Sequence, residues 1–230
     1  MHGFLGTCPG PTLRKRFRHL SSIAPGLHLI ATPIGAARDI TLRALDLLAG
    51  CDMLVAEDTR SLRRLMDLHG VALNGRRVLP YHDHNGAQLR PRLLNALQAG
   101  QSVLYASEAG TPLVSDPGFG LARAAIDNGL PVLAAPGASA VMAALCVAGL
   151  PSDRFCFLGF PPAQAGARRR YLAEAALIPA TLVFYESPHR IMDSLRSFAE
   201  VFGDDRYVVL ARELTKTFES IHGDKVADLI

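Results

Sequence analysis

From Leu27 onward, short apolar runs alternate with longer amphipathic stretches, and no other feature of the sequence constrains the fold as strongly. Short runs rich in Val, Leu, Ile and Ala are typical of strands that are buried on both faces of a parallel sheet. The stretches between them repeat apolar residues at the spacing of an amphipathic helix. The pattern therefore predicts an α/β fold with a mostly parallel sheet and helices on both of its faces.

The elements of the first half follow from this pattern. We expect strands near residues 27–31, 52–56, 77–80, 102–106 and 131–135, and helices near residues 40–49, 59–68, 87–99, 117–128 and 138–148. Asp39 and Asp58 stand where N-caps are expected, because a carboxylate accepts hydrogen bonds from the free N–H groups of a first helical turn. Gly70, Gly100 and Gly129 stand where three of the helices should end.

The pattern begins again after residue 151, which predicts a second domain. We expect its strands near residues 155–158, 181–185, 206–211 and 217–221, and its helices near residues 166–176 and 189–201. The predicted organisation is a disordered basic tail over residues 1–26, an N-terminal α/β domain over 27–150, and a smaller mixed α/β domain over 151–230. The residues from Asp224 onward begin like an N-capped helix and then stop, so we expect the second domain to be incomplete.

Charge is distributed unevenly along the chain. Residues 1–26 carry Arg14, Lys15, Arg16 and Arg18 without an acid, which leaves 20 basic and 21 acidic residues in the rest of the sequence. Contact with a polyanion would therefore depend on local patches of positive charge and not on a global field. Such patches are expected at Arg63-Arg64, Arg76-Arg77 and Arg168-Arg169-Arg170.

Two classes of protein are disfavoured by the composition. No apolar run reaches the length of about 18 residues that a membrane span needs, so we expect no membrane contact. The cysteines Cys8, Cys51, Cys146 and Cys156 lie at no metal-ligand spacing, and we interpret them as free thiols of a cytoplasmic protein.

In an open parallel sheet, ligands bind beyond the carboxyl ends of the strands, so the residues that follow each strand are the candidates for a site. Residues 31–35 lack the GxGxxG pattern, which disfavours a Rossmann dinucleotide site. Glu57 and Asp58 are adjacent carboxylates, with helix capping as the alternative role of Asp58. Residues 81–85 offer a general base or hydrogen bonds to a ribose. A metal site there would need a third ligand, and simple anchoring of the loop stays open.

The longest loop, residues 107–118, holds two glycines, two prolines and two acids between a strand and a helix. Such a rigid turn is rarely a mere connector, and its Glu108 and backbone amides are candidates for holding a small polar ligand. Residues 135–140 are small and open a helix, where a ligand can approach the backbone closely. Residues 184–190 and 211–216 are polar strand ends, with capping and surface exposure as their alternative roles.

Eight segments, in order and at family-like spacing, resemble the tetrapyrrole-methylase fold family, and within it the methyltransferases of small-subunit ribosomal RNA. They are spread along the chain, so that the resemblance extends over nearly all of residues 27–223: ATPIGAARDITLRALDLL, AEDTR, YHDHN, AGTPLVSDPG, PGASA, LPSDRFCFLGFPP, FYESPHR and ARELTK. The resemblance implies two domains that bind S-adenosylmethionine between them, commonly as a homodimer. It also implies transfer of a methyl group to the ribose 2′-hydroxyl of a cytidine in 16S ribosomal RNA (16S rRNA) of the small ribosomal subunit.

The resemblance also assigns residues to roles. The cofactor is expected to contact Thr32, Pro33, Ile34, Glu108, Ala109, Gly110, Thr111, Ser139, Ala140 and Tyr185. The RNA is expected to contact Arg60, Asn85, Arg190, Arg212 and Lys216. The candidate catalytic residues are His82, His84 and Glu186, with one of the two histidines as the first candidate base. No metal is expected.

The sequence departs from the family pattern in three places. Glu108 stands where the family usually has Asp, Ala138 stands where it typically has a second proline, and a C-terminal segment of the family is absent. Two alternatives follow. The chain could be a tetrapyrrole or diphthine methyltransferase of the same fold, although YHDHN, FYESPHR and ARELTK favour the RNA enzyme. It could also be a non-catalytic binding module.

Overall fold

The computed structural model describes residues 23–82, 84–114 and 118–230, and the chain divides into two compact units. The first unit comprises the described residues up to Pro33 together with Ala37–Ala138, and the second comprises Ile34–Ala36 and Ser139–Ile230. Most of the basic tail expected over residues 1–26 lies outside the described residues. The sequence placed the domain boundary after residue 150, whereas the units divide before Ser139.

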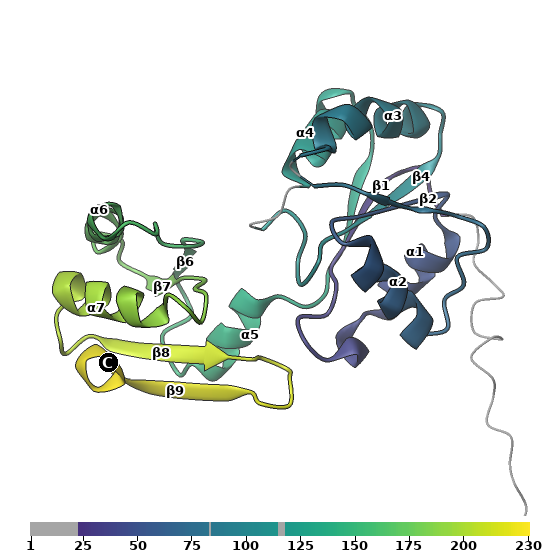
Figure 1. Cartoon of the computed structure of the whole chain (residues 1–230). Coiled ribbons are helices and arrows are strands. Elements are labelled where there is room, and N and C mark those ends of the chain that lie inside the picture. Colours follow the sequence, from purple (N-terminus) through teal and green to yellow (C-terminus); the bar gives the residue numbers. More distant parts are fainter. Residues whose placement is uncertain (1–22, 83, 115–117) are drawn as a thin grey trace, which may run out of the picture. The chain divides into compact units, whose positions relative to one another are not determined.

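The first unit is built on a five-stranded sheet in the order β3-β2-β4-β1-β5 (Figure 1). Its strands are β1 (Gly26–Ile30), β2 (Met53–Ala56), β3 (Val78–Pro80), β4 (Ser102–Ala106) and β5 (Val132–Ala135), and all of their pairings are parallel. Its helices are α1 (Leu42–Gly50), α2 (Thr59–Leu68), α3 (Gly86–Gln98) and α4 (Phe119–Asp127). The predicted fold class is confirmed, and each of these elements begins and ends within two residues of its predicted place.

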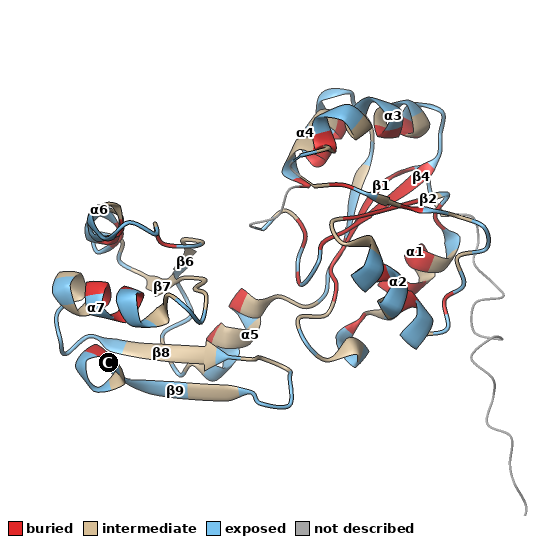
Figure 2. Cartoon of the chain, viewed as in Figure 1, coloured by how far each residue is buried: buried red, intermediate tan, exposed pale blue. Residues whose placement is uncertain are grey.

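Two hydrophobic cores lie on opposite faces of this sheet. Leu104 of β4 belongs to the same core as Leu48 of α1, and α2 packs on this face as well. The next residue, Tyr105, belongs to the other core with Leu93 of α3, and α4 completes that face. Successive side chains of a strand point to opposite faces, so a strand covered on both sides should be mostly apolar. Figure 2 shows β1, β2 and β4 as buried, as this arrangement requires.

The second unit has a smaller core and more exposed strands. Its elements are α5 (Ala140–Val147), β6 (Phe155–Phe157), α6 (Ala165–Ala175), β7 (Thr181–Val183), α7 (Ile191–Phe202), β8 (Tyr207–Arg212) and β9 (Ser220–Lys225), followed by a 3₁₀ helix over Val226–Leu229. Strands β6 and β7 pair in parallel, and β8 and β9 pair antiparallel. The buried core residues are Leu172, Leu195, Phe198 and Val226.

The predicted helix ends are partly right. Asp58 caps α2, since its Oδ1 accepts a hydrogen bond from Arg60 N at 2.7 Å. Asp39 was a wrong prediction, because it ends a short 3₁₀ turn and Thr41 caps α1 instead. Asp224 starts no helix, because it pairs within β9. The three terminating glycines are confirmed by positive φ angles at Gly70 (68°), Gly100 (79°) and Gly129 (67°).

Asp52 and Ser102 tie the start of β4 to the residue before β2. Ser102 N and Oγ donate to Asp52 Oδ2 at 2.8 and 2.7 Å, and Asp52 N donates to Ser102 Oγ at 2.9 Å. The hydrogen bonds from Ser102, led by the one from its backbone N–H, hold the pKa of Asp52 below its ordinary value. A lowered carboxylate pKa contributes stability that is present above the unfolded-state pKa and is lost as the pH falls through the folded-state pKa.

Replacing Ser102 by alanine is therefore expected to lower the free energy of unfolding by about 1 kcal/mol near pH 7, because the Asp52 carboxylate loses the hydrogen bond that the Ser102 hydroxyl donates. The loss should shrink as the pH falls below about 4, where Asp52 becomes protonated in the unfolded chain. Urea unfolding followed by circular dichroism at pH 7 and pH 3 measures both values. Ser152→Ala, at an exposed serine, is the control and should leave the free energy of unfolding unchanged at both pH values. An equal loss at both pH values would contradict a role for the carboxylate.

Among the helices in the described part of the chain, none is long and apolar enough to cross a lipid bilayer.

Candidate active site

The loops of the first unit that follow β1, β2, β3, β4 and β5 lie at one edge of the sheet, because all the strands run in the same direction. Hydrogen bonds tie three of these loops together. Thr32 and Gly110 exchange two backbone hydrogen bonds of 3.0 Å each, and Thr32 Oγ1 donates to Ser107 O at 3.3 Å. Thr111 Oγ1 donates to Ala138 O at 3.0 Å, which joins the loop after β4 to the loop after β5.

Two carboxylates face the same edge from neighbouring strands. Glu57 directly follows β2, and its Oε2 accepts a hydrogen bond from Glu108 N at 3.3 Å. Glu108 and Ala109 are exposed, whereas the adjacent Gly110 is buried. Gly110 has a φ of +79°, which a side chain would strain. The loop therefore holds the Glu108 carboxylate at the surface on a backbone fixed from both sides.

The loop after β3 carries the two candidate histidines. Asn85 closes this loop, since its Oδ1 accepts from His82 N at 2.9 Å and its Nδ2 donates to Pro80 O at 2.9 Å. The imidazole rings of His82 and His84 lie edge to face, with centroids 5.9 Å apart. His82 is half-buried, and among the described residues its buried Nδ1 has no hydrogen-bond partner. Asn85 thus holds the backbone of the loop that carries both histidines.

Buried aromatic side chains pack next to this loop and support it. Tyr81 is buried, its ring meets Tyr105 edge to face at 5.9 Å, and its hydroxyl accepts from Arg90 Nε at 3.3 Å. A Cβ atom at Gly86 would lie 3.0 Å from the Tyr81 ring. Sequence reasoning missed this support, although a tyrosine within the apolar run of β4 was a signal of it.

Tyr185, a predicted cofactor contact, lies in the second unit within an aromatic cluster. Its ring centroid lies 4.7 Å from that of Phe157 and 5.5 Å from that of Phe160. Burial raises the pKa of Tyr185, and a hydrogen bond from the Val141 backbone opposes the shift. Val141 belongs to the first turn of α5, whose N-cap is Ser139. The second unit therefore brings Tyr185 to the helix that begins with Ser139 and Ala140.

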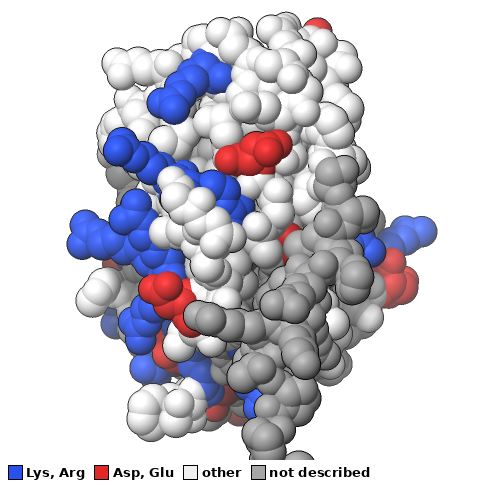
Figure 3. Space-filling model, turned by 90° about the vertical axis from the view of Figure 1, so that its right-hand side faces the viewer, with Lys and Arg blue, Asp and Glu red and all other residues white. Residues whose placement is uncertain are grey.

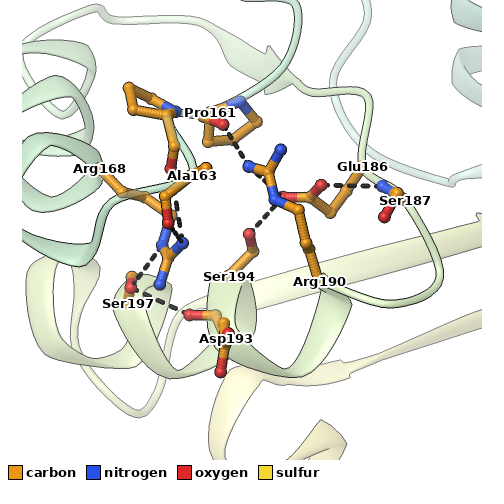
Figure 4. A network of polar contacts seen from close by, with 10 residues as sticks. Pro161, Ala163, Arg168, Glu186, Ser187, Arg190, Asp193, Ser194 and Ser197 are labelled. Atoms are coloured by element: carbon orange, nitrogen blue, oxygen red, sulfur yellow. Dashed lines mark hydrogen bonds and ion pairs between the residues drawn. The ribbon is translucent and has the colours of Figure 1, made fainter.

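Glu186 and Arg190, predicted as a catalytic and an RNA-contacting residue, are engaged with each other. The Glu186 side chain is only 7% exposed and lies 3.3 Å from Arg190 Nη2. Its oxygens also accept from Ser187 N at 2.8 Å and from Ser194 Oγ (Figure 4). Arg190 Nη2 donates in addition to Pro161 O. This geometry favours a bracing role for both side chains.

The segment that follows β8 packs against residues 34–36. Ala36 N donates to Thr215 Oγ1 at 3.0 Å, and a Cβ atom at Gly35 would lie 2.5 Å from the Lys216 side chain. Lys216 pairs with Glu213 at 3.1 Å, and Arg212 is exposed. The Ile34 loop is thereby fixed within the second unit.

Exposed arginines flank the site loops. In the face shown in Figure 3, blue Lys and Arg side chains gather on one side, with few red carboxylates among them. Helix α2, which directly follows Glu57 and Asp58, exposes Arg60, Arg63 and Arg64. In contrast, Arg168 does not belong to a surface patch as predicted, because it is only 5% exposed.

The predicted site residues are divided between the two units. The first unit holds Thr32, Pro33, Arg60, His82, His84, Asn85 and Glu108–Thr111, and the second holds Ile34, Ser139, Ala140, Tyr185, Glu186, Arg190, Arg212 and Lys216. Their roles in binding and catalysis stay predictions. Within the described ranges, no three His, Cys, Asp or Glu side chains lie close enough together to hold a metal ion.

Solved structures of other proteins share this fold. The methyltransferase CobJ matches with a TM-score of 0.68 and 20% identity, over 89% of this chain and 88% of that one. Diphthine synthase matches with a TM-score of 0.67 and 18% identity, over 88% of this chain and 82% of that one. At this identity the likeness shows the fold alone.

Sequence comparisons give a closer relationship. Ribosomal RNA small subunit methyltransferase I of Mesorhizobium japonicum is 50% identical over 199 residues, which cover 86% of this chain and 67% of that protein. The protein of the same name from Escherichia coli O157:H7 is 48% identical, over 89% of this chain and 70% of its own length. Residues 26–230 match the family described as Tetrapyrrole (Corrin/Porphyrin) Methylases. The chain therefore belongs to the tetrapyrrole methylase family, whose methyl donor is S-adenosylmethionine.

Proposed function

We propose that this methyltransferase transfers a methyl group to the ribose 2′-hydroxyl of a cytidine in 16S rRNA of the small ribosomal subunit. One observation carries the proposal. Relatives named for small-subunit ribosomal RNA are 48% and 50% identical over most of both units, whereas the solved diphthine and tetrapyrrole enzymes are 18–20% identical. Because a shared fold alone does not imply a shared function, the much higher identity to the relatives named for ribosomal RNA favours the RNA substrate.

The residues present fit S-adenosylmethionine. Exposed Glu108 supplies a carboxylate for ribose hydroxyls or for positive charge, and the small residues of the 136–140 segment let a ligand approach the backbone. The first turn of α5 offers N–H groups and the positive end of a helix dipole to a carboxylate. When bound, the cofactor supplies an electrophilic methyl group on a sulfonium centre. We expect Thr32, Gly110 and Thr111 to shape its contact surface through their fixed backbone.

A ribose hydroxyl is a weak nucleophile, so its proton must pass to a base during or after the attack. We assign this role to His82. His82 is half-buried on a loop whose backbone is held by Asn85, and its buried Nδ1 has no hydrogen-bond partner in the described part of the chain. His84 is exposed and stands second. Glu186 was a third candidate, but its oxygens already accept from three groups of its own unit.

The proposal is tested by incubating the chain with labelled S-adenosylmethionine and small ribosomal subunits that lack the modification. Label on a cytidine 2′-oxygen is the expected result. The 48% identical Escherichia coli relative serves as the positive control in the same assay. If the chain binds the cofactor but transfers no label to the subunits while the relative does, the proposed RNA substrate is wrong. Transfer of label to a tetrapyrrole or to a diphthine precursor would instead identify the chain as the corresponding methyltransferase of the same fold.

The exposed arginines of α2 are expected to bind RNA phosphates. Arg63 and Arg64 follow Arg60 by three and four residues and therefore lie on the same side of the helix as Arg60. No described carboxylate forms an ion pair with any of the three within 4.0 Å.

Replacing these three arginines by glutamine should therefore weaken binding of the small subunit and flatten its salt dependence. For single-stranded contacts, we expect the slope of log affinity against log salt concentration to fall by about 2. A filter-binding titration between 50 and 200 mM salt measures it. The charge-matched control replaces Arg123, Arg169 and Arg196, which pair with carboxylates at the surface, and should leave the slope unchanged. Equal slopes in both triple variants would contradict the assignment.

We also propose that the chain forms a homodimer and is located in the cytoplasm, as the family resemblance implies. Light scattering on the purified chain tests the first, with twice the 24.7 kDa mass of the chain as the expected result.

A further inference from the structure

The loop after β6, which we call the Phe160 loop (residues 158–163), is held by hydrogen bonds along most of its backbone. Tyr185 N donates to Gly159 O at 2.8 Å, and Arg190 Nη2 donates to Pro161 O. The next two carbonyls along the chain accept from Arg168 Nη1 at 3.4 and 3.1 Å. Tyr171 OH donates to the carbonyl of residue 158. Within residues 158–163, every backbone carbonyl except that of Phe160 therefore accepts a hydrogen bond.

Arg168, which holds two of these carbonyls, is buried at an energetic cost. Arg168 is only 5% exposed, and no described carboxylate lies within ion-pair distance of it. Its remaining contact is Ser197 Oγ at 2.9 Å (Figure 4). A buried guanidinium without a carboxylate loses hydration that neutral acceptors only partly replace. An arrangement of this cost indicates that the position of the loop matters for more than connection.

The side chain that the loop presents is Phe160. It is 54% exposed, although the two prolines that follow it are buried or half-buried. Its ring packs on Tyr185 at 5.5 Å, and Tyr185 packs on Phe157 at 4.7 Å, so two further rings support it. A ring that is already fixed in place loses little conformational entropy when a flat ligand stacks on it. Phe160 thus forms a preorganised, supported and accessible aromatic surface.

Flat rings with polar edges are the ligands that such a surface suits. RNA-binding proteins recognise single-stranded RNA by stacking unstacked bases on aromatic side chains. A nucleotide whose 2′-hydroxyl is to be methylated must be accessible, which favours bases that have left the helical stack. We propose that Phe160 stacks on an unstacked base of the substrate RNA, an inference that rests on the proposed function.

The test compares the wild-type chain with Phe160→Leu and Phe160→Trp. Leucine keeps an apolar side chain but removes the π face, whereas tryptophan keeps the face. We expect Phe160→Leu to weaken the affinity for unmodified small subunits by about five- to 150-fold, which corresponds to the loss of one base stack. Phe160→Trp should restore it. Phe218→Leu, at a phenylalanine that is 80% exposed in the same unit, is the matched control and should bind as the wild type does.

Two further readouts separate the possible roles of the ring. Calorimetric titration with S-adenosylmethionine should give the same dissociation constant for the wild type and for Phe160→Leu, and thermal unfolding should give the same midpoint. A weakened cofactor affinity with unchanged subunit affinity would overturn the inference, because the ring would then stack on the cofactor adenine. Unchanged affinities for both ligands would overturn it as well. If the wild type itself fails to bind small subunits, the proposed function fails and not the stacking role alone.

Discussion

His82→Ala is expected to lower the single-turnover rate of methyl transfer by about 10²- to 10⁴-fold, the usual contribution of a general base. The expectation follows from the loop that carries His82. Asn85 closes the loop through Pro80 and the His82 backbone, and the buried Tyr81 supports it. A base on a loop with a fixed backbone is kept near its substrate, so that removing it loses both proton transfer and positioning. Quench-flow measurement at saturating cofactor and excess enzyme isolates the chemical step.

His84→Ala is the matched control, because it removes an exposed imidazole from the same loop while leaving the hydrogen bonds of Asn85 in place. It should change the rate by less than about tenfold, since no step of the proposed mechanism uses it. His82→Gln, which keeps a hydrogen-bonding side chain without a base, should be as slow as His82→Ala. A large loss only in His84→Ala would exchange the two roles. Near-native rates in both alanine variants would place the base outside the loop.

The order of the elements could be predicted because it is set by local pattern. The central strands β1, β2 and β4 are short, mostly apolar runs covered on both faces, and the helices carry apolar stripes, so the period of the sequence changes between these elements. The ends of helices depend on finer geometry. Asp58 caps α2 as predicted, but Asp39 is separated from α1 by the buried Ile40, and Thr41 adopts the extended backbone of an N-cap instead.

The candidate site could be predicted only in part, because contacts between distant segments are not visible in a local pattern. The sequence places Thr32 and Gly110 in different loops, and only the parallel order of β1 and β4 brings them into hydrogen-bonding contact. Glu186 resembled a free carboxylate, yet Ser194 of the following helix and Arg190 enclose it. Its proposed role changes from catalysis to bracing for this reason.

The burial of Arg168 could have been predicted from the spacing of apolar residues along α6. It was grouped with Arg169 and Arg170 as a basic patch, but α6 turns its side chain inward while both neighbours stay exposed. Leu172 and Ala175 follow Arg168 by four and seven residues, and both are buried. Residues at this spacing share one helix face. The apolar stripe of α6 thus contained the signal that Arg168 faces the core of the second unit.

Arg168→Ala is expected to destabilise the second unit by about 2–4 kcal/mol, because it leaves a cavity and removes hydrogen bonds to Ser197 and to the Phe160 loop. The two units need not unfold together, so urea unfolding followed by circular dichroism is fitted for two transitions. Only the transition of the second unit should move. Arg169→Ala removes the neighbouring arginine, whose ion pair with Glu200 is exposed, and should cost less than about 0.5 kcal/mol.

Arg168→Met separates packing from hydrogen bonding. The methionine side chain fills much of the same space without a buried charge, and such replacements are often neutral or stabilising. We therefore expect Arg168→Met to regain most of the stability that Arg168→Ala loses. It frees the two carbonyls of the Phe160 loop that Arg168 binds, so its affinity for small subunits should stay as weak as that of Phe160→Leu. Wild-type affinity in a stable Arg168→Met protein would show that Phe160 needs no such fixed loop to contact RNA.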